Sequence, residues 1–393
     1  MRAEFCRRLI LIVSMLAGFA CPAQTNGIFA DFTTSLGTFT CQLSYSNAPK
    51  AVASFIGLAT GQRPWLDLAS GLVRTNPFYD GLIFHRVISN FVDQAGSPNG
   101  LGTDGPGYSF VDEFNPLLNF NTPWILGLAN SGPDSNGSQF FITVAPFANG
   151  NNIYTVFGRA VSGTNVLAAI NHVATDSNDK PKTNVYIQQV TIRRVGGAAE
   201  AFDINAQGLP GVTNIPVMIA QAAGGVALSF SNRPYADTRW YSSTNLTSWT
   251  ANKFGIEITS PSSNSVSVAT DAPAKFFRAA QIQYPSTTFA PKNVLGRTLI
   301  MAFSAGLGTN TIVFNTSGGG TYNLAGTNPN SGTLKSYTWS QQPYNGLLQP
   351  IQYSGLLDMD LDLNFGSYTN GTFTGTAYST FPFSVSGTFK LSP

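Results

Sequence analysis

The sequence has few charged side chains. Only 10% of its 393 residues are Asp, Glu, Lys or Arg, against about 25% in typical soluble domains. The formal net charge is +2, and Arg2, Arg7 and Arg8 stand at the N-terminus with Glu4. Without these four residues the basic and acidic side chains are equal in number. No basic stripe indicates nucleic acid, and no polybasic segment indicates a membrane surface.

Histidine and cysteine are also scarce. The two histidines, His85 and His172, lie in unrelated segments, which argues against a histidine-rich metal site, and we expect neither a metal nor a cofactor. The three cysteines are Cys6, Cys21 and Cys41. Loss of the N-terminal segment leaves only Cys41, so an intramolecular disulfide is excluded. Cys41 lies in an alternating apolar run and is predicted to be a small core residue.

Long apolar runs are confined to the N-terminus. Arg7 and Arg8 precede an apolar run, Leu9 to Ala20, which is too short to span a bilayer comfortably and is followed by the small-residue site Cys21-Pro22-Ala23. We predict that residues 1–23 are a signal peptide and that the mature protein is extracytoplasmic, periplasmic or secreted, and bacterial, with no transmembrane segment. The alternatives are an N-terminal anchor helix and a lipid anchor at Cys21, which Phe19 fits badly.

The chain after residue 23 is long enough for several domains. Hydrophobic residues make up 43% of the full sequence, enough to form their cores. The first domain is predicted over 27–195, before a break at 196–199. Residues 50–59 and 165–172 show helical spacing and the loop 62–76 is long. Strands are expected at 28–32, 37–45, 83–88, 91–94, 140–144, 155–161 and 185–195. The pattern predicts a mainly β fold, a closed antiparallel barrel capped by two helices.

Two further β-rich domains are expected. Residues 200–284 contain five strand-like runs, and we expect a small sandwich whose core is made of aromatic residues, namely Trp240, Tyr241, Trp249, Phe276 and Phe277. Residues 285–393 alternate more clearly and predict an antiparallel sandwich or barrel. The segments 241–249 and 276–278 resemble small β-domains of bacterial secreted proteins. We expect residues 200–393 to contact other macromolecules, such as cell-envelope material or polysaccharide, and to carry no chemistry.

One arginine stands inside an apolar run. Arg86 lies in Phe84-His85-Arg86-Val87-Ile88, shortly before Phe91-Val92-Asp93-Gln94. Arginine is rarely placed among apolar residues without a function. A second segment runs from Leu128-Ala129-Asn130 to Gln139-Phe140-Phe141.

Together these segments resemble the cyclophilin family of peptidyl-prolyl cis/trans isomerases, and the likeness extends over 27–195. The resemblance implies that Arg86 is the catalytic arginine and that Gln94 works beside it. It assigns the substrate groove to other positions, namely Phe91, Val92, Ala129, Asn130, Gln139, Phe141 and Tyr154. Val92 replaces a common methionine and Tyr154 a common histidine. Ungapped counting puts Asn149 in the place of a pocket aromatic and Gly150 in that of a leucine, whereas a two-residue shift puts Phe147 in the aromatic place.

Each prominent polar residue also has a structural interpretation. Arg86 alternatively forms a buried pair with a carboxylate such as Glu113. His85 is predicted to be a core histidine. Asp358, Asp360 and Asp362 alternate with apolar residues, which favours one polar face of a strand over a calcium site.

The predicted function is therefore prolyl isomerisation of extracytoplasmic polypeptides, without a cofactor and with proline-containing chains as substrates. The alternative is a catalytically weak module that binds proline peptides or cell-envelope material.

Overall fold

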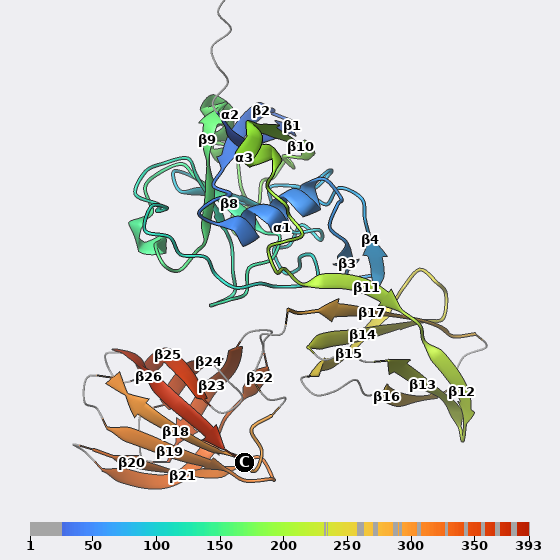
Figure 1. Ribbon diagram of the computed structural model, residues 1–393, viewed down its shortest axis with the longest axis vertical. Coiled ribbons are helices and arrows are strands. Elements are labelled where there is room, and N and C mark those ends of the chain that lie inside the picture. The colour runs from blue at the N-terminus through green and yellow to red at the C-terminus, as the bar shows by residue number, and fades with distance from the viewer. Residues whose placement is uncertain are drawn as a thin grey trace, which may run out of the picture.

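A computed structural model describes residues 26–231, 233, 235–257, 263–269, 274–285, 290, 293–304, 308–326, 329–341, 345–354, 358–365, 370–378 and 383–392. The predicted signal peptide, residues 1–23, lies outside these residues. Within them the chain is mainly β with few helices, as the sequence predicts, and three β-rich parts follow one another (Figure 1).

Across the described ranges, no helix has both the length and the apolar character needed to cross a bilayer.

The first part is an antiparallel sheet of eight strands in the order β10-β1-β2-β9-β7-β8-β6-β5. The strands are β1 (Gly27–Thr34), β2 (Gly37–Leu43), β5 (Arg86–Ile88), β6 (Val92–Ala95), β7 (Ile125–Leu128), β8 (Phe140–Thr143), β9 (Val156–Ser162) and β10 (Ile187–Val195). Its two edges meet where the Phe84 amide donates to Val185 O at 3.0 Å and the Ile187 amide donates to Leu82 O at 2.7 Å. These bonds close the barrel. The strand predicted at 83–88 begins only at Arg86 in the structure, because the residues before it bond to the chain next to β10.

Two helices pack on this barrel. Helix α1 (Pro49–Ala59) begins at a proline, whose missing N–H is no loss in a first turn, and its residues from Ala51 onward are buried. The next two amides, of Lys50 and Ala51, donate to the Glu113 carboxylate at 3.1 and 2.8 Å. Glu113 therefore caps α1, and the proposed pairing of Arg86 with Glu113 is wrong. Helix α2 (Thr164–Asn171) packs against β2, β5 and β6.

Aromatic rings fill the barrel. Phe55 of α1 lies 4.9 to 5.9 Å, centroid to centroid, from four rings that come from different segments, namely Phe32, Tyr79, Phe140 and Phe157. All five side chains are at most 1% exposed, and Cys41 is buried among the same core residues, as predicted. Because this core is complete, the barrel is a rigid support for its surface loops.

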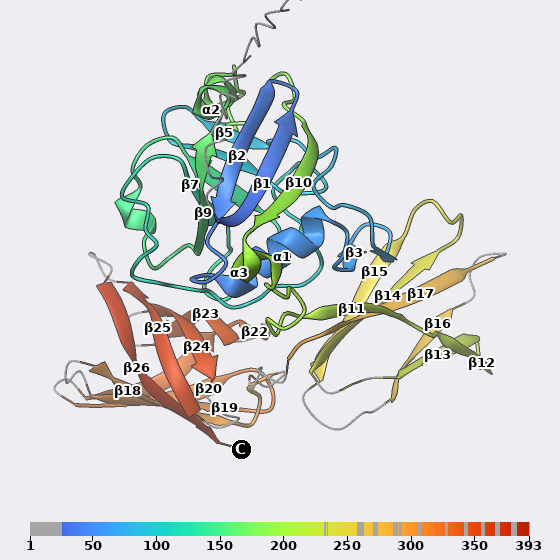
Figure 2. The same cartoon turned by 45° about the horizontal axis from the view of Figure 1, so that its top comes forward.

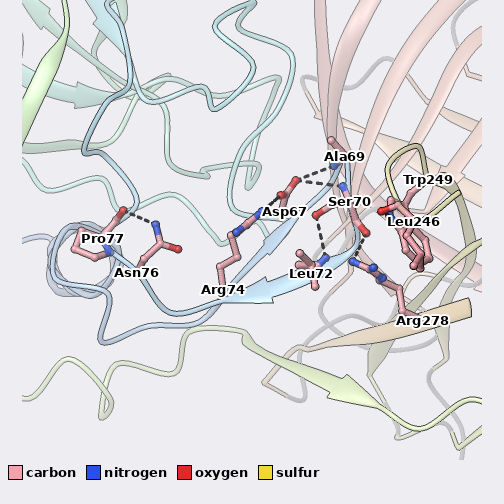
Figure 3. A network of polar contacts seen from close by, with 10 residues as sticks. All are labelled: Asp67, Ala69, Ser70, Leu72, Arg74, Asn76, Pro77, Leu246, Trp249 and Arg278. Carbon is pink, nitrogen blue, oxygen red and sulfur yellow. Dashed lines mark hydrogen bonds and ion pairs between the residues drawn. The ribbon is translucent and has the colours of Figure 1, made fainter. Parts of the chain in front are cut away.

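The long loop predicted at 62–76 is instead a hairpin. Strands β3 (Trp65–Asp67) and β4 (Leu72–Arg74) pair across a turn that Asp67 organises, since its Oδ1 accepts the amides of Ala69 and Ser70 and its Oδ2 binds Arg74 (Figure 3). Two strands of three residues are too short for an alternating pattern to reveal them. Three other short elements were not predicted, namely strand β7 of the barrel, the 3-10 helix η1 (Ala148–Gly150) and helix α3 (Gly197–Glu200).

The second part is a sandwich of two small sheets, as the sequence predicts, but it has seven strands and not five, because those at 211–215 and 250–257 were not predicted. One sheet has the order β11-β17-β14-β15 and the other β12-β13-β16. Their bounds are β11 (Gly211–Ile215), β12 (Met218–Ala222), β13 (Gly225–Ser231), β14 (Ala236–Ser243), β15 (Thr250–Glu257), β16 (Ser263–Ala269) and β17 (Phe276–Gln283). The shared core contains Leu228, Phe230, Trp240 and Ala279, with Phe277 beside it. Of the other aromatic residues expected there, Phe276 is 38% exposed, and Trp249 and Tyr241 lie at the hairpin.

The sandwich docks on the β3–β4 hairpin. Arg278 of β17 donates to Ser70 O at 3.0 Å while its guanidinium carbon lies 3.4 Å from the Trp249 ring centroid (Figure 3). Gly71, at φ +71°, packs so closely on Tyr241 that an added Cβ would lie 2.3 Å from the ring. Arg63 donates to Pro210 O at 3.1 Å in a buried position. The core of the first barrel thus continues into residues of the second part, namely Val212, Ala280, Ile282 and Tyr284.

The third part is a closed barrel of eight strands with a ninth strand attached (Figure 2). Its strands are β18 (Thr298–Phe303), β19 (Thr309–Phe314), β20 (Gly320–Ala325), β21 (Asn330–Ser336), β22 (Trp339–Gln341), β23 (Asn345–Tyr353), β24 (Asp358–Phe365), β25 (Asn370–Tyr378) and β26 (Phe383–Ser392). The pairing of β21 with β23 closes the ring, and β22 is added to β23. In β24 the apolar residues point inward and Asp358, Asp360 and Asp362 outward, as the alternation predicts.

Candidate functional site

The hairpin of β5 and β6 carries the two residues predicted to be catalytic. Arg86 lies directly opposite Gln94 in the antiparallel register. The Arg86 side chain is 46% exposed, and its Nε lies 3.4 Å from Oδ2 of Asp179, which is 43% exposed. Arg86 is therefore a surface residue with a carboxylate neighbour, so its guanidinium has donors available to a bound peptide.

Asp179 reaches Arg86 from a tightly bonded loop. Oδ1 of Asp176 accepts the amides of Asn178 and Lys180, and Asp179 O accepts the Val87 amide at 2.7 Å. Asp179 has φ +60°, a conformation that Asp adopts more readily than most residues. The backbone bond to β5 thus places this carboxylate beside Arg86. Sequence reasoning missed Asp179, whose surroundings show only a turn signature.

Gln94 and Gln139 are brought together beside the arginine. Gln94 Nε2 donates to Gln139 Oε1 at 3.0 Å. Gln139 Nε2 donates in turn to the carbonyls of Gly102 and Asp104 at 3.0 and 2.9 Å. This chain of bonds joins β6, the start of β8 and the loop 96–108, so the two amides have fixed orientations.

The residues predicted to form an apolar pocket pack together as one cluster. It combines the predicted residues Val92 and Phe141, each 5% exposed, with half-buried Phe91 and Tyr154. The Phe141 ring centroid lies 5.3 Å from that of Tyr154 and 5.4 Å from that of Phe120.

Phe147 is the aromatic residue that the shifted count places in this pocket. Its ring is 4.9 Å from Phe91 and 6.4 Å from Phe141, centroid to centroid. The ungapped assignment to Asn149 is therefore wrong. Gly150 packs under Phe147, where a Cβ would lie 2.5 Å from the ring. Phe120 was missed, because it stands in an Asn- and Pro-rich loop without strand or helix periodicity.

Ala129 and Asn130 border the pocket just after β7. The Ala129 amide donates to Gln139 O at 2.9 Å, which joins this segment to the start of β8. Asn130 Nδ2 donates to Ile153 O at 2.8 Å, next to Tyr154. The predicted groove residues from three separate segments are thus brought together around one surface.

His85, next to Arg86 in sequence, is buried at 6% exposure, as predicted for a core histidine. Burial lowers its pKa to about 4, so the ring is neutral at pH 7. Its packing partner is Gly102 of the loop 96–108, which needs a positive φ of +75°. His85 therefore supports the groove and contributes no charge to it.

Residues 29–192 match the family model described as cyclophilin type peptidyl-prolyl cis-trans isomerase/CLD. Peptidyl-prolyl cis-trans isomerase A of Mycobacterium tuberculosis is 43% identical over 178 residues, which are 44% of this chain and 98% of that protein. Peptidyl-prolyl cis-trans isomerase B of Streptomyces anulatus is 45% identical over 170 residues, 42% of this chain and 96% of that protein. A crystal structure of a cyclophilin-type isomerase of Cryptosporidium parvum is 29% identical, with a TM-score of 0.38, and covers 43% of this chain and 98% of that one.

The matched stretches thus cover nearly all of these two bacterial isomerases, and the family model places the match on the first barrel and its loops. The same barrel holds the arginine, the paired glutamines and the aromatic pocket that the sequence motifs predict. The chain belongs to the cyclophilin family of peptidyl-prolyl cis/trans isomerases.

Proposed function

We propose that this protein isomerises X–Pro bonds of extracytoplasmic polypeptides and that Arg86 is the group that accelerates the rotation. The observation that carries the proposal is the position of Arg86, half-exposed beside an apolar pocket and opposite Gln94. The apolar run at Leu9–Ala20 and the low charge of the chain support the location.

The reaction requires only a change of hydrogen bonding. Rotation of a peptide bond faces a barrier of about 18–20 kcal/mol, because twisting removes the amide resonance. The twisted amide carries a lone pair on the prolyl nitrogen that the planar amide lacks. A guanidinium N–H that donates to this nitrogen stabilises the twisted form selectively, which is differential binding of the transition state.

The neighbouring residues hold substrate and arginine in place. The pocket of Phe91, Val92 and Phe141 accepts the proline ring, so the ring stays fixed while the preceding carbonyl turns. The segment Ala129–Asn130 lies where a bound chain would pair its backbone. Asp179 holds the Arg86 guanidinium through Nε, which leaves the terminal nitrogens for the substrate.

Arg86→Lys tests this role. Lysine keeps the charge but replaces a planar fork with a mobile ammonium, so we expect kcat/KM to fall about 100-fold, or about 2.7 kcal/mol, with an unchanged fold. The measurement is NMR exchange of a short proline peptide. The matched control is Arg159→Lys on β9, an exposed arginine outside the site, which should keep full activity. Near-normal activity of Arg86→Lys would exclude the role.

The location is tested separately. Fractionation of producing cells followed by N-terminal sequencing should find a mature chain outside the cytoplasm that lacks residues 1–23. A full-length chain in the cytoplasm would contradict the extracytoplasmic role and leave the chemistry untouched.

A further inference from the structure

One acidic side chain inside the first barrel takes no direct part in the groove. Asp93 of β6 is 0% exposed and stands between the groove residues Val92 and Gln94. Strand alternation turns those two toward the groove and Asp93 toward the opposite face. Asp93 Oδ1 accepts a bond from Asn171 Nδ2 at 2.8 Å, and Oδ2 is buried with no hydrogen-bond partner among the described residues. Such a buried oxygen is costly and calls for an explanation.

Asn171, the last residue of α2, bonds to the same hairpin at two further points. Its Nδ2 also donates to Ile88 O at 2.9 Å, and its Oδ1 accepts the Asn90 amide at 2.6 Å. Asn90 has φ +58°, so the turn between β5 and β6 depends on a conformation that needs support. Through one buried side chain, α2 is thus bonded to both ends of the turn and to Asp93.

The charge state of Asp93 changes near neutral pH. Burial raises its pKa to about 7, against the lowering effects of the Asn171 bond and of the neighbouring His172. Its other close neighbours are apolar, Val87 across β5 and Ile142 across β8. On β5, the Arg86 guanidinium lies on the other face of the hairpin with Asp179.

The direction in which pH changes the stability follows from the raised pKa of Asp93. The folded protein holds the Asp93 proton more tightly than the unfolded chain does, so folding is favoured at low pH. As the pH rises from about 4 to about 7, the unfolded chain releases this proton while the folded barrel still holds it, so the folded state loses stability. Near pH 7 the charge forms inside the folded barrel itself. A buried carboxylate without a second partner draws in water or loosens its contacts.

We propose that Asp93 and Asn171 are positioning residues of the isomerase: neutral Asp93 lets the β5–β6 hairpin pack closely on α2, whereas its ionisation leaves Oδ2 as a buried charge without a hydrogen-bond partner among the described residues, which displaces Arg86 and Gln94 and slows turnover. The proposal rests on the proposed role of Arg86, because the hairpin carries that side chain. It makes the turnover of this chain sensitive to pH through a residue that never touches the substrate.

The test measures kcat and KM of the full chain by NMR exchange of a proline peptide between pH 5.5 and 8.5. We expect kcat to fall about five-fold with a midpoint near 7, with KM changing less than about two-fold. Asp93→Asn, which is isosteric and always neutral, should keep the low-pH kcat across the range. Asn171→Ala removes a bond that lowers the pKa, so it should shift the midpoint to higher pH. His172→Gln, the matched control, should retain the step.

Several results would overturn the proposal. A pH-independent kcat in the parent chain, or a step that survives in Asp93→Asn, would remove Asp93 from turnover. Loss of the step in His172→Gln would assign it to the histidine. Should Asp93→Asn fail to fold, an unchanged midpoint in Asn171→Ala would decide against the pair. Near-normal activity of Arg86→Lys would contradict the proposed role of Arg86 but would leave the pH-dependent step in kcat unchanged. The failure of the two proposals can therefore be told apart.

Discussion

The chain contains two closed barrels of eight antiparallel strands, and they differ in what they bury. The first, over 27–195, encloses polar side chains such as His85, Asp93 and Asn171 beside its aromatic core. In the described part of the C-terminal barrel, Asn310 is the one polar side chain classed as buried, and it bonds to Tyr353 at 3.3 Å. The other buried side chains of its core are aliphatic or aromatic residues and methionines, with the hydroxyls of Tyr322 and Tyr353 among them.

This contrast separates what the two barrels share from what distinguishes the first. Both barrels are stabilised by alternating apolar residues and closed edges. The proposed isomerase site lies where the first barrel departs from that pattern, with an exposed arginine, two bonded glutamines and buried polar groups beneath their hairpin. In the C-terminal barrel, by contrast, β24 follows the alternation strictly. Function depends on such exceptions and not on the fold class.

The largest expected effects are on the stabilities of the two barrels, and two matched substitutions measure them separately. Phe55→Ala removes the central ring of the first core and should destabilise that barrel by about 4 kcal/mol. Phe373→Ala, at 1% exposure, should destabilise the C-terminal barrel by a similar amount. The midpoint of denaturant unfolding, measured by the loss of isomerase activity, should shift for Phe55→Ala only. A shift of the activity midpoint in Phe373→Ala would show that the barrels unfold together.

The second prediction concerns the sandwich between them. Residues 24–196 alone should fold and isomerise a short peptide within a few-fold of the full rate. They should be less stable than residues 24–284 by about 3 kcal/mol, because Arg63 loses Pro210 and the core loses residues such as Val212 and Ile282. Comparison of 24–284 with the full chain is the control and should show no difference in rate. A large drop in rate for folded 24–196 would mean that the later parts complete the groove.

The smallest effect is expected at the docking contact. Arg278→Ala loses the bond to Ser70 O and the stacking on Trp249, and should lower the unfolding free energy of residues 24–284 by about 1–2 kcal/mol without changing kcat. Thermal unfolding measures it, with the exposed Gln221→Ala on β12 as control. An unchanged midpoint would show that the hairpin contact does not stabilise the pair of domains.

Sequence reasoning succeeded where periodicity or a continuous motif carries the information. Alternation predicted most strands of the C-terminal barrel but missed β23, whose sequence does not alternate strictly. The run from Phe84 to Gln94 predicted the hairpin with its arginine. It failed where the partner comes from elsewhere in the chain. Tyr241 was recognised as buried, but its partner is Gly71 of the first barrel's hairpin. Phe120 and Asp179 lie in loops, whose positions are fixed by backbone bonds that no local pattern encodes.

The register of β1 determines when the isomerase barrel is completed during synthesis. Ile28 pairs with Leu43 on one side and with Arg194 on the other. The local hairpin with β2 can form within microseconds of its emergence. The second partner follows only after roughly 150 more residues, which take about ten to thirty seconds at ordinary translation rates. For that interval one edge of β1 is open on the nascent chain, so folding of the active domain waits for its last strand.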